Sequence, residues 1–415
     1  MKFLHPSVTP DQKTLHFTPL GLGLLYLSTV VATTLLVTYV QPLIRPKAAT
    51  VSAVSSPASA TPVWGELVEQ DIDLAQPEEY VAFEPTTGRI ETWNLPGTVD
   101  DVRKTLTDCG LDTAQVDRAL SPALVAVSGS SIAIKPDDDL VFSLSPETRA
   151  KFYAVLGQTP GNRYMQSPYH FFGDSVEAFF HESNVSSSIV SEVKRLVYKR
   201  ASTLLFSDLE VVLNHIDSQR EKLSFLKALT RQRAVLANLR ITKNTDIDKI
   251  LGYWTAPPAV HIKDLRPFLN SVRRSGNESL LPLTFLLPPL VKAKLYTFAM
   301  PTKPGDVQMD CHWTALNFFQ ETPDDRFADF SFTSQYVNTH YYQIAKPSLV
   351  GDLIFLLDQN GQVIHSAVYL ADDLIFTKNG VNYAQPWIMM HMKDLVSVYT
   401  DTYEPKVWFY RSKDL

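Results

Sequence analysis

A long uncharged segment near the N-terminus constrains this chain more than any other feature. No charged residue occurs from Phe17 to Val40, and the stretch from Leu20 to Val40 is rich in Leu, Val, Tyr and Thr. A helix of roughly 20 apolar residues spans the hydrocarbon core of a membrane. The sequence therefore predicts a transmembrane anchor over residues 17–41, behind a short N-terminal tail of residues 1–16.

Two alternatives to an anchor are a buried core helix and a cleaved signal peptide. A signal peptide has a shorter apolar region, of roughly 7–15 residues, with small residues at a cleavage site close behind it. Here the small residues from Ala58 to Ala60 lie far downstream. Residues 42–63 are rich in Ala, Ser, Thr, Val and Pro, which is typical of a flexible linker rather than of a packed core. We therefore favour an uncleaved single-pass anchor that tethers the rest of the chain.

The body of the protein is large enough for two or three domains, because the whole chain has 415 residues. The whole chain contains 45% hydrophobic and 20% charged residues, which is typical of packed globular domains. A formal net charge of -6 without a concentrated basic tract argues against a nucleic-acid partner. Only Cys109 and Cys311 occur, which excludes a disulfide-rich scaffold and a zinc site made of thiolates alone, while one disulfide between them stays an alternative.

Local patterns divide the body into three regions and predict an α+β protein. Residues 64–160 mix helices and strands, residues 161–275 are largely helical, and residues 276–415 form a last domain. The expected helices run from Asp100 to Cys109, from Thr113 to Leu120 and onward from Ser145, and the expected strands are Ser131–Ile134 and Leu140–Leu144, joined by an acidic turn. Leucines at helical spacing, up to Leu229 and Leu236, support the helical region. The histidines there follow no metal-ligand spacing, so no metal or other cofactor is expected.

Cys311 begins an expected helix in the last domain. Trp313, Leu316 and Phe319 recur after it at helical spacing. The partial positive charge at the start of a helix stabilises a thiolate, which is the attacking form of a cysteine nucleophile. The alternative is that Cys311 is a small buried hydrophobic residue.

A β-hairpin downstream supplies a candidate base. The apolar run Leu353–Leu357 and a following Asn-Gly turn predict the hairpin. On the returning strand, simple alternation places Val363, His365, Ala367 and Tyr369 on one face. Imidazole titrates near neutrality and can deprotonate a thiol, so His365 is a candidate general base. A hydrogen-bonded core histidine is the alternative.

Three motifs in this order resemble the NlpC/P60 cell-wall peptidases, which have a papain-like fold. The motifs are Asp310-Cys311-His312-Trp313, Gly351-Asp352-Leu353-Ile354-Phe355 and His365-Ser366-Ala367-Val368-Tyr369-Leu370. The resemblance covers the stretch from about Leu295 to Phe376, and the spacing from Gly351 to His365 fits the family.

The resemblance implies a papain-like catalytic domain over residues 276–415, with Cys311 as the nucleophile and His365 as the base. In the family a third polar residue, which orients the imidazole, follows the histidine by a strand and a turn. Asn379 is our candidate for that position, and an asparagine that only shapes the turn before Gly380 is the alternative.

The resemblance also implies three residues that contact the substrate. Tyr296 lies where the family has a tyrosine that helps to bind the developing oxyanion, and an unrelated core tyrosine is the alternative. His312 and Trp313 replace the family's Ser-Gly after the cysteine, so we expect them to change the shape of the substrate cleft.

The resulting functional expectation is a membrane-anchored cysteine hydrolase of the cell envelope. By resemblance it would cleave amide bonds in peptidoglycan stem peptides, with its body on the periplasmic or extracellular side of the membrane. The few basic residues on either side of the anchor do not decide this orientation. The alternatives are a catalytically inactive binding or scaffolding protein with the same fold, and an acyltransferase that uses Cys311 and His365.

Overall fold

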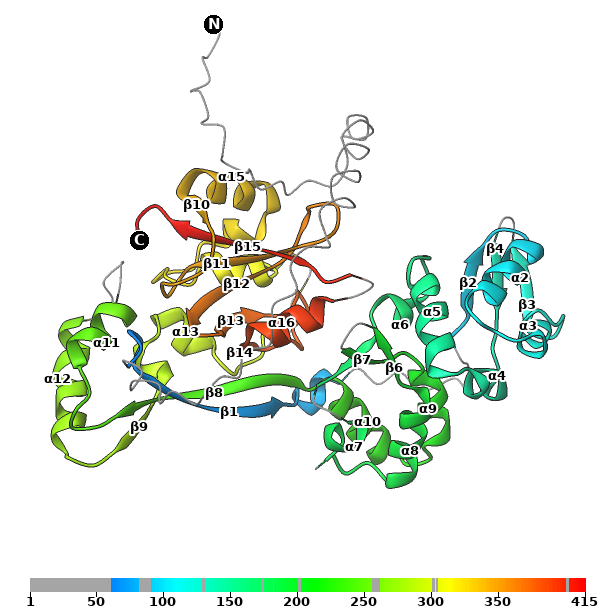
Figure 1. Cartoon of the computed structure of the whole chain (residues 1–415), viewed down its shortest axis with the longest axis horizontal. Coiled ribbons are helices and arrows are strands. Elements are labelled where there is room, and N and C mark those ends of the chain that lie inside the picture. The colour runs from blue at the N-terminus through cyan, green and yellow to red at the C-terminus, as the bar shows by residue number, and fades with distance from the viewer. Residues whose placement is uncertain are drawn as a thin grey trace, which may run out of the picture.

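The protein is described here by a computed structural model (Figure 1). The structure describes residues 61–81, 91–128, 131–172, 175–181, 183–200, 203–255, 262–300, 303, 305–400 and 403–415. Within these residues, helices accompany sheets whose neighbouring strands run antiparallel, so the expected α+β class is confirmed. The expected membrane anchor over residues 17–41 lies outside the described residues, and none of the helices described is long and apolar enough to cross a membrane.

One hydrophobic core runs from Trp93 to Leu229 and forms the lobe at the right of Figure 1. Its strands form two sheets of order β2-β4-β3 and β5-β7-β6. These strands are β2 (Trp93–Pro96), β3 (Val125–Ser128), β4 (Ser131–Ile134), β5 (Tyr169–Phe171), β6 (Tyr198–Arg200) and β7 (Thr203–Phe206). The helices are α2 (Val99–Asp108), α3 (Thr113–Ala119), α4 (Asp138–Ser143), α5 (Pro146–Gly157), α6 (Arg163–Gln166), α7 (Val176–Phe179), α8 (Ser187–Leu196), α9 (Leu209–His215) and α10 (Gln219–Leu229). The boundary expected between residues 160 and 161 falls inside this core.

Most local expectations for this lobe are confirmed, but one strand is wrong. Helices α2, α3 and α5 and strand β4 lie where the sequence predicted them. The segment from Leu140 to Leu144, expected to be a strand, belongs mainly to helix α4 instead. The side chain of Asp137 accepts a hydrogen bond from the backbone N–H of Leu140 and so caps this helix. Asp138 and Asp139 occupy its first turn, where the positive end of the helix favours acidic side chains, so the acidic run begins a helix rather than forming a hairpin turn.

A buried ion pair lies inside the same lobe. The guanidinium of Arg149 on α5 lies 3.2 Å from a carboxylate oxygen of Asp208, and both side chains are almost completely buried. The hydroxyl of Tyr153 donates to the other carboxylate oxygen of Asp208 at 2.6 Å. Burial raises the pKa of Asp208, and Arg149 opposes that shift. The ion pair and the tyrosine hydroxyl therefore offset the burial of this carboxylate, although Nε of Arg149 and Oδ2 of Asp208 form no hydrogen bond.

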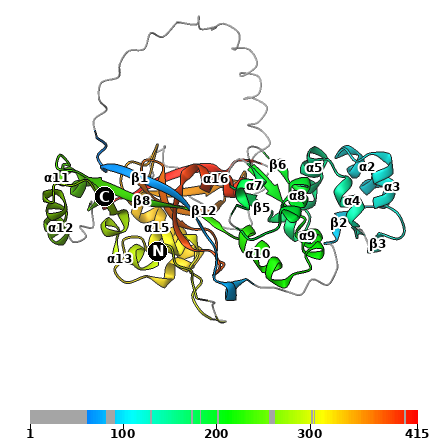
Figure 2. The ribbon, with the colours of Figure 1, turned by 90° about the horizontal axis from the view of Figure 1, so that it is seen from below.

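A long β-ribbon connects this lobe to the rest of the protein. Figures 1 and 2 show β1 and β8 running side by side, from the neighbourhood of α11 and α12 to that of α10. The elements around the ribbon are β1 (Glu66–Leu74), η1 (Glu78–Tyr80), β8 (Gln232–Ile241), α11 (Ile247–Trp254), α12 (Ile262–Arg274), β9 (Ser279–Pro282), η2 (Leu283–Leu286) and α13 (Pro289–Lys294). The strand order is β1-β8-β9, so β1 is an edge strand. Leu236 lies on β8 opposite Gln70, so its assignment to a helix was wrong, and the region expected to be largely helical also contains β6 and β7.

The last domain contains a six-stranded antiparallel sheet of order β10-β15-β11-β12-β13-β14. Its strands are β10 (Tyr341–Ile344), β11 (Leu353–Leu357), β12 (Val363–Ala371), β13 (Leu374–Lys378), β14 (Trp387–His391) and β15 (Lys406–Ser412). Its helical segments are α14 (Cys311–Leu316), η3 (Asp325–Ala328), α15 (Phe330–His340) and α16 (Met392–Tyr399). The expected helix at Cys311 and the expected hairpin of β11 and β12 are both confirmed. Gly361 closes the hairpin turn by donating its N–H to the carbonyl of Asp358 at 3.1 Å.

Both faces of this sheet are buried, and a different helix covers each of them. Phe355 and Val368 belong to the core on the side of α14. Leu356 and Ala367 belong to the core on the side of α16, which also receives Ala234 from β8. These two faces decide where the predicted site residues lie.

Candidate functional site

Cys311 is the first residue of α14, and Asp310 caps this helix. The carboxylate of Asp310 accepts a hydrogen bond from the backbone N–H of Trp313 at 2.8 Å. Trp313 and Leu316 belong to the core on one face of the sheet, so α14 lies on that face. Cys311 is free of any disulfide and is only 6% exposed. The alternative of a disulfide with Cys109 is therefore not realised.

The side chain of His365 lies on the opposite face of the sheet. His365 pairs in register with Leu356, which belongs to the core on the α16 side. The next residue, Ser366, pairs with Phe355 and shares a hydrogen bond of 2.8 Å with His312 of α14. Because side chains alternate along a strand, Ser366 faces α14 and His365 faces α16.

No hydrogen bond therefore joins the predicted nucleophile to the predicted base among the described residues. Cys311 lies on the helix that covers one face of β12, whereas the imidazole of His365 projects from the other face. Nδ1 of His365 is buried without a hydrogen-bond partner in the described part of the chain. The hairpin and the helix were expected, but the imidazole faces α16 and bonds to Thr377 rather than to the thiol.

Thr377, not Asn379, holds the imidazole of His365. Its hydroxyl oxygen lies 2.8 Å from Nε2 of His365, and the hydroxyl donates to the carbonyl of Ser366 at 3.4 Å. Both contacts fit the tautomer in which the hydroxyl donates to that carbonyl and accepts from Nε2–H, and this tautomer has a lone pair on Nδ1. Asn379 instead directs its amide nitrogen at the sulfur of Met390, 3.7 Å away. A polar residue in the middle of a buried strand was the signal that sequence reasoning passed over.

Tyr399 covers His365. The two rings stack with their centroids 4.3 Å apart and their planes 28° apart, and His365 is 0% exposed. Burial raises the pKa of Tyr399, with further contributions from Cys311 and Asp310, which lie near enough to act on the phenol. Tyr399 is the last residue of α16, so this helix closes the α16 face of the sheet over the imidazole.

The three residues expected to contact substrate have structural partners instead. Tyr296 donates its hydroxyl to the carbonyl of Val235 on β8 at 2.5 Å. Trp313 is buried and donates its indole N–H to Asp325 at 3.1 Å. His312 is buried, and burial lowers the pKa of its imidazole while Asp310 opposes the shift. These contacts bind α14 and the loops around it to the core.

Lys378 is a buried cation on the α14 face that sequence reasoning did not single out. It pairs with Trp387 across the sheet, and its ammonium donates to the carbonyls of Gly380 and Asn382 at 2.8 Å each. Burial lowers the pKa of Lys378 to about 8, and the charges of Cys311 and Asp310 oppose this shift. Its hydrogen bonds give it a structural role in holding the turn after β13.

The Gly-Asp motif before β11 also has a structural explanation. Gly351 has a φ of +95°, and a Cβ atom there would lie 2.2 Å from the ring of Phe319. The buried carboxylate of Asp352 accepts hydrogen bonds from the backbone N–H groups of Ser348 and Leu349 and from the guanidinium of Arg411. The motif therefore fixes the entry into β11.

One cluster in the described part of the chain has the composition of a metal site. Glu69, Asp373 and His391 bring one donor atom each within 4.8 Å of one another. Nδ1 of His391 lies 2.9 Å from Asp373, and Nε2 lies 3.6 Å from Asp71. Although partial burial opposes it, the hydrogen bond to Asp373 and the surrounding carboxylates raise the pKa of His391. These carboxylates hold the imidazole by a hydrogen bond and by charge, and we assign them no metal.

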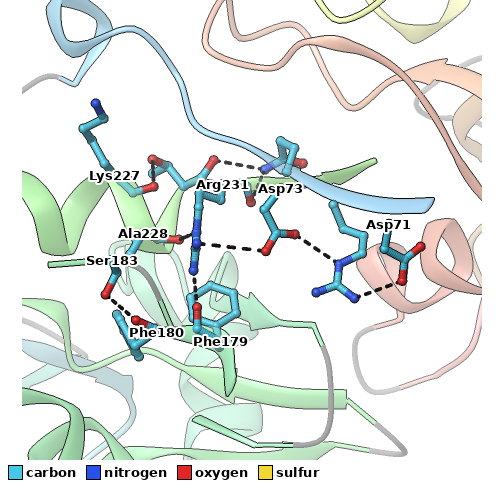
Figure 3. A network of polar contacts seen from close by, with 11 residues as sticks. Asp71, Asp73, Phe179, Phe180, Ser183, Lys227, Ala228 and Arg231 are labelled. Carbon is cyan, nitrogen blue, oxygen red and sulfur yellow. Dashed lines mark hydrogen bonds and ion pairs between the residues drawn. The ribbon is translucent and has the colours of Figure 1, made fainter. Parts of the chain in front are cut away.

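A polar cavity of about 680 Å³ lies between the ribbon and the helical lobe. Figure 3 shows Arg231 pointing towards Asp73 of β1 and towards the main chain of Phe179 and Ala228. Asp73 also receives the guanidinium of Arg233 at 3.1 Å. These contacts fasten the edge strand β1 to the lobe and form one wall of the cavity. The sequence did not predict this cavity, because its walls come from segments about 150 residues apart.

Comparisons with known proteins give no relative. No protein-family model, no curated protein and no solved structure matches this chain.

Proposed function

We propose that this chain is a membrane-anchored binding or scaffolding protein of the cell envelope. In this proposal the last domain has an NlpC/P60-like, papain-like fold but does not use Cys311 as a nucleophile. The single observation that supports it most is that no hydrogen bond joins Cys311 and His365, whose Nδ1 is buried without a partner among the described residues. A thiol nucleophile needs its base within hydrogen-bond reach, and here the imidazole is bonded to Thr377 instead.

The remaining contacts of the predicted site support the same proposal. His365 is held by Thr377 and covered by Tyr399, while Cys311 is almost fully buried. Reactive cysteines lie in partly exposed surroundings, whereas buried structural cysteines react slowly. The anchor over residues 17–41 and the linker behind it would hold the two lobes near a membrane surface.

Iodoacetamide labelling tests this proposal on the full chain. Cys109 is also free and buried, so it serves as an internal reference for a structural thiol. We expect both cysteines of the folded protein to react at least about tenfold more slowly than in urea, as buried thiols do. Rapid alkylation of Cys311 below pH 7, with Cys109 still protected, would overturn the proposal. Cys311→Ala identifies which thiol carries the label.

A cysteine hydrolase is the second candidate, and one observation favours it. Nδ1 of His365 has no hydrogen-bond partner among the described residues, and in the tautomer with the proton on Nε2 it carries the lone pair that a general base needs. Catalysis would require Tyr399 to move away and α14 to shift so that Cys311 meets the imidazole. Turnover of purified muropeptides that is lost in Cys311→Ala would establish this candidate, and transfer to an added amine would distinguish an acyltransferase from a hydrolase.

A further inference from the structure

The cavity between β1 and α10 exposes the main chain of an edge strand. The consecutive residues Asp71, Ile72 and Asp73 all line it. Side chains of successive strand residues point to opposite faces, so three in a row can border one cavity only where the edge of the strand faces it. Among the described residues β1 pairs with β8 alone, so its other edge is open. An open edge is a template for an additional strand.

The acids in the cavity wall are already neutralised. Arg233 pairs with Asp73 at 3.1 Å and with Asp71 at 3.5 Å. Glu78 pairs with Lys227 at 3.3 Å, and because both side chains are partly exposed this pair contributes little. With Arg231 also 4.0 Å from Asp73, two guanidinium groups balance Asp71 and Asp73, whereas Glu78 would share Lys227 with an anionic ligand.

The opposite wall carries two cations, of which Lys227 pairs with the exposed Glu78. Arg220 and Lys227 lie on α10 and both line the cavity. Arg220 is exposed and has no ion pair within the described ranges of the chain. Seven residues make two turns of helix, so the two cations lie on one face of α10, about 10 Å apart along its axis. Leu223 and Ser224 lie between them and also line the cavity.

We propose that this cavity binds an extended acidic peptide from a partner protein, which adds as a strand to the free edge of β1. This inference rests on the proposed binding role and names the class of partner. Two glutamates at alternate positions of a strand have Cα atoms about 7 Å apart and point to the same side. The spacing of the two glutamates is about 3 Å shorter than that of Arg220 and Lys227, and the four long side chains can bridge this difference. The volume of about 680 Å³ lies in the range of roughly 300–1,000 Å³ that is typical of ligand sites.

Fluorescence anisotropy with a fluorescein-labelled peptide of sequence Thr-Glu-Val-Glu-Thr tests the proposal. We expect saturable binding that weakens as salt is added, because ions screen exposed charges. The double variant Arg220→Glu and Lys227→Glu should raise the Kd at least about tenfold, which corresponds to 1.4 kcal/mol. The matched control Lys104→Glu with Lys151→Glu changes the charge equally at exposed positions outside the cavity and should bind like the original protein.

Two further peptides separate the parts of the proposal. A peptide with glutamine in place of glutamate should bind at least about tenfold more weakly, in line with lost charge pairs. A peptide methylated on alternate backbone nitrogens should also lose binding, because it cannot pair with an edge strand. Equal binding of the glutamate and glutamine peptides, or equal Kd values for the cavity and control variants, would overturn the inference. Thiol labelling is a separate measurement. A reactive Cys311 would refute the non-catalytic role of the last domain but would leave the peptide-binding result unchanged.

Discussion

Replacing Thr377 by Val tests the environment of His365 most directly. Valine keeps the shape of threonine but removes the hydroxyl that accepts from Nε2 of His365. Both side chains are 0% exposed, so no water can replace the lost partner at the surface. Nδ1 of His365 already lacks a partner, and the substitution leaves the whole imidazole unsatisfied.

The structure gives the expected size of the effect. A buried donor that loses its only acceptor costs about 1–3 kcal/mol. The second hydrogen bond of Thr377, to the carbonyl of Ser366, is 3.4 Å long and adds little. Thr377→Val should therefore lower the free energy of unfolding by about 1–3 kcal/mol. When His365 is first replaced by Leu, the same change should cost about 0.5 kcal/mol or less, because no donor is left unsatisfied.

Urea unfolding followed by tryptophan fluorescence measures these four proteins as a double-mutant cycle. Five of the six tryptophans lie in or against the core on the α14 face, so the signal reports mainly on the last domain and the ribbon beside it. A coupling energy between Thr377 and His365 of at least about 1 kcal/mol is expected. A cost of Thr377→Val that is the same in both backgrounds would refute the reasoning.

Three other outcomes are expected. Tyr399→Ala should speed the modification of His365 by diethylpyrocarbonate at least about tenfold, measured by mass spectrometry, since the stacked phenol covers the buried ring; an unchanged rate would contradict the covering role. His391 has a raised pKa, so its stabilising contribution is full below its ordinary value of about 6.5 and is lost as the pH rises through the raised folded-state pKa. His391→Gln should therefore flatten the fall in unfolding midpoint above about pH 6.5, and an unaltered slope would count against it. Arg149→Met should cost about 3–5 kcal/mol in urea unfolding by leaving Asp208 buried and unpaired, and a cost below about 1 kcal/mol would exclude that pairing as the cause.

Local sequence signals were reliable where one short-range interaction decides the structure. Ser145 begins a helix because its side chain accepts the N–H of Thr148, and Cys311 begins another because Asp310 caps it. The Asn-Gly turn between two apolar runs gave the hairpin of β11 and β12. The same reasoning failed at Leu140, where a capping aspartate outweighed a strand-like run of apolar residues.

The alternation expected along β12 holds only in part. His365, Ala367 and Tyr369 lie on one face, as expected, but Val363 belongs to the core on the other face. The register shifts between Leu356 and Leu357, so that Ile364 has no partner across the ladder. A β-bulge of this kind reverses which face of the sheet the following side chains point to. The alternation of residue types in the sequence does not reveal such a bulge.

The sequence by itself determined that Cys311 starts a helix, that His365 lies on a strand of a hairpin, and that the two follow each other in the order of a thiol hydrolase. Only the tertiary structure decided on which side of that hairpin the helix packs. Both faces of the sheet are apolar, so hydrophobicity alone gives α14 no preference between them. The choice depends on contacts between distant segments, and it brings His312 of α14 to Ser366 while the neighbouring His365 faces α16.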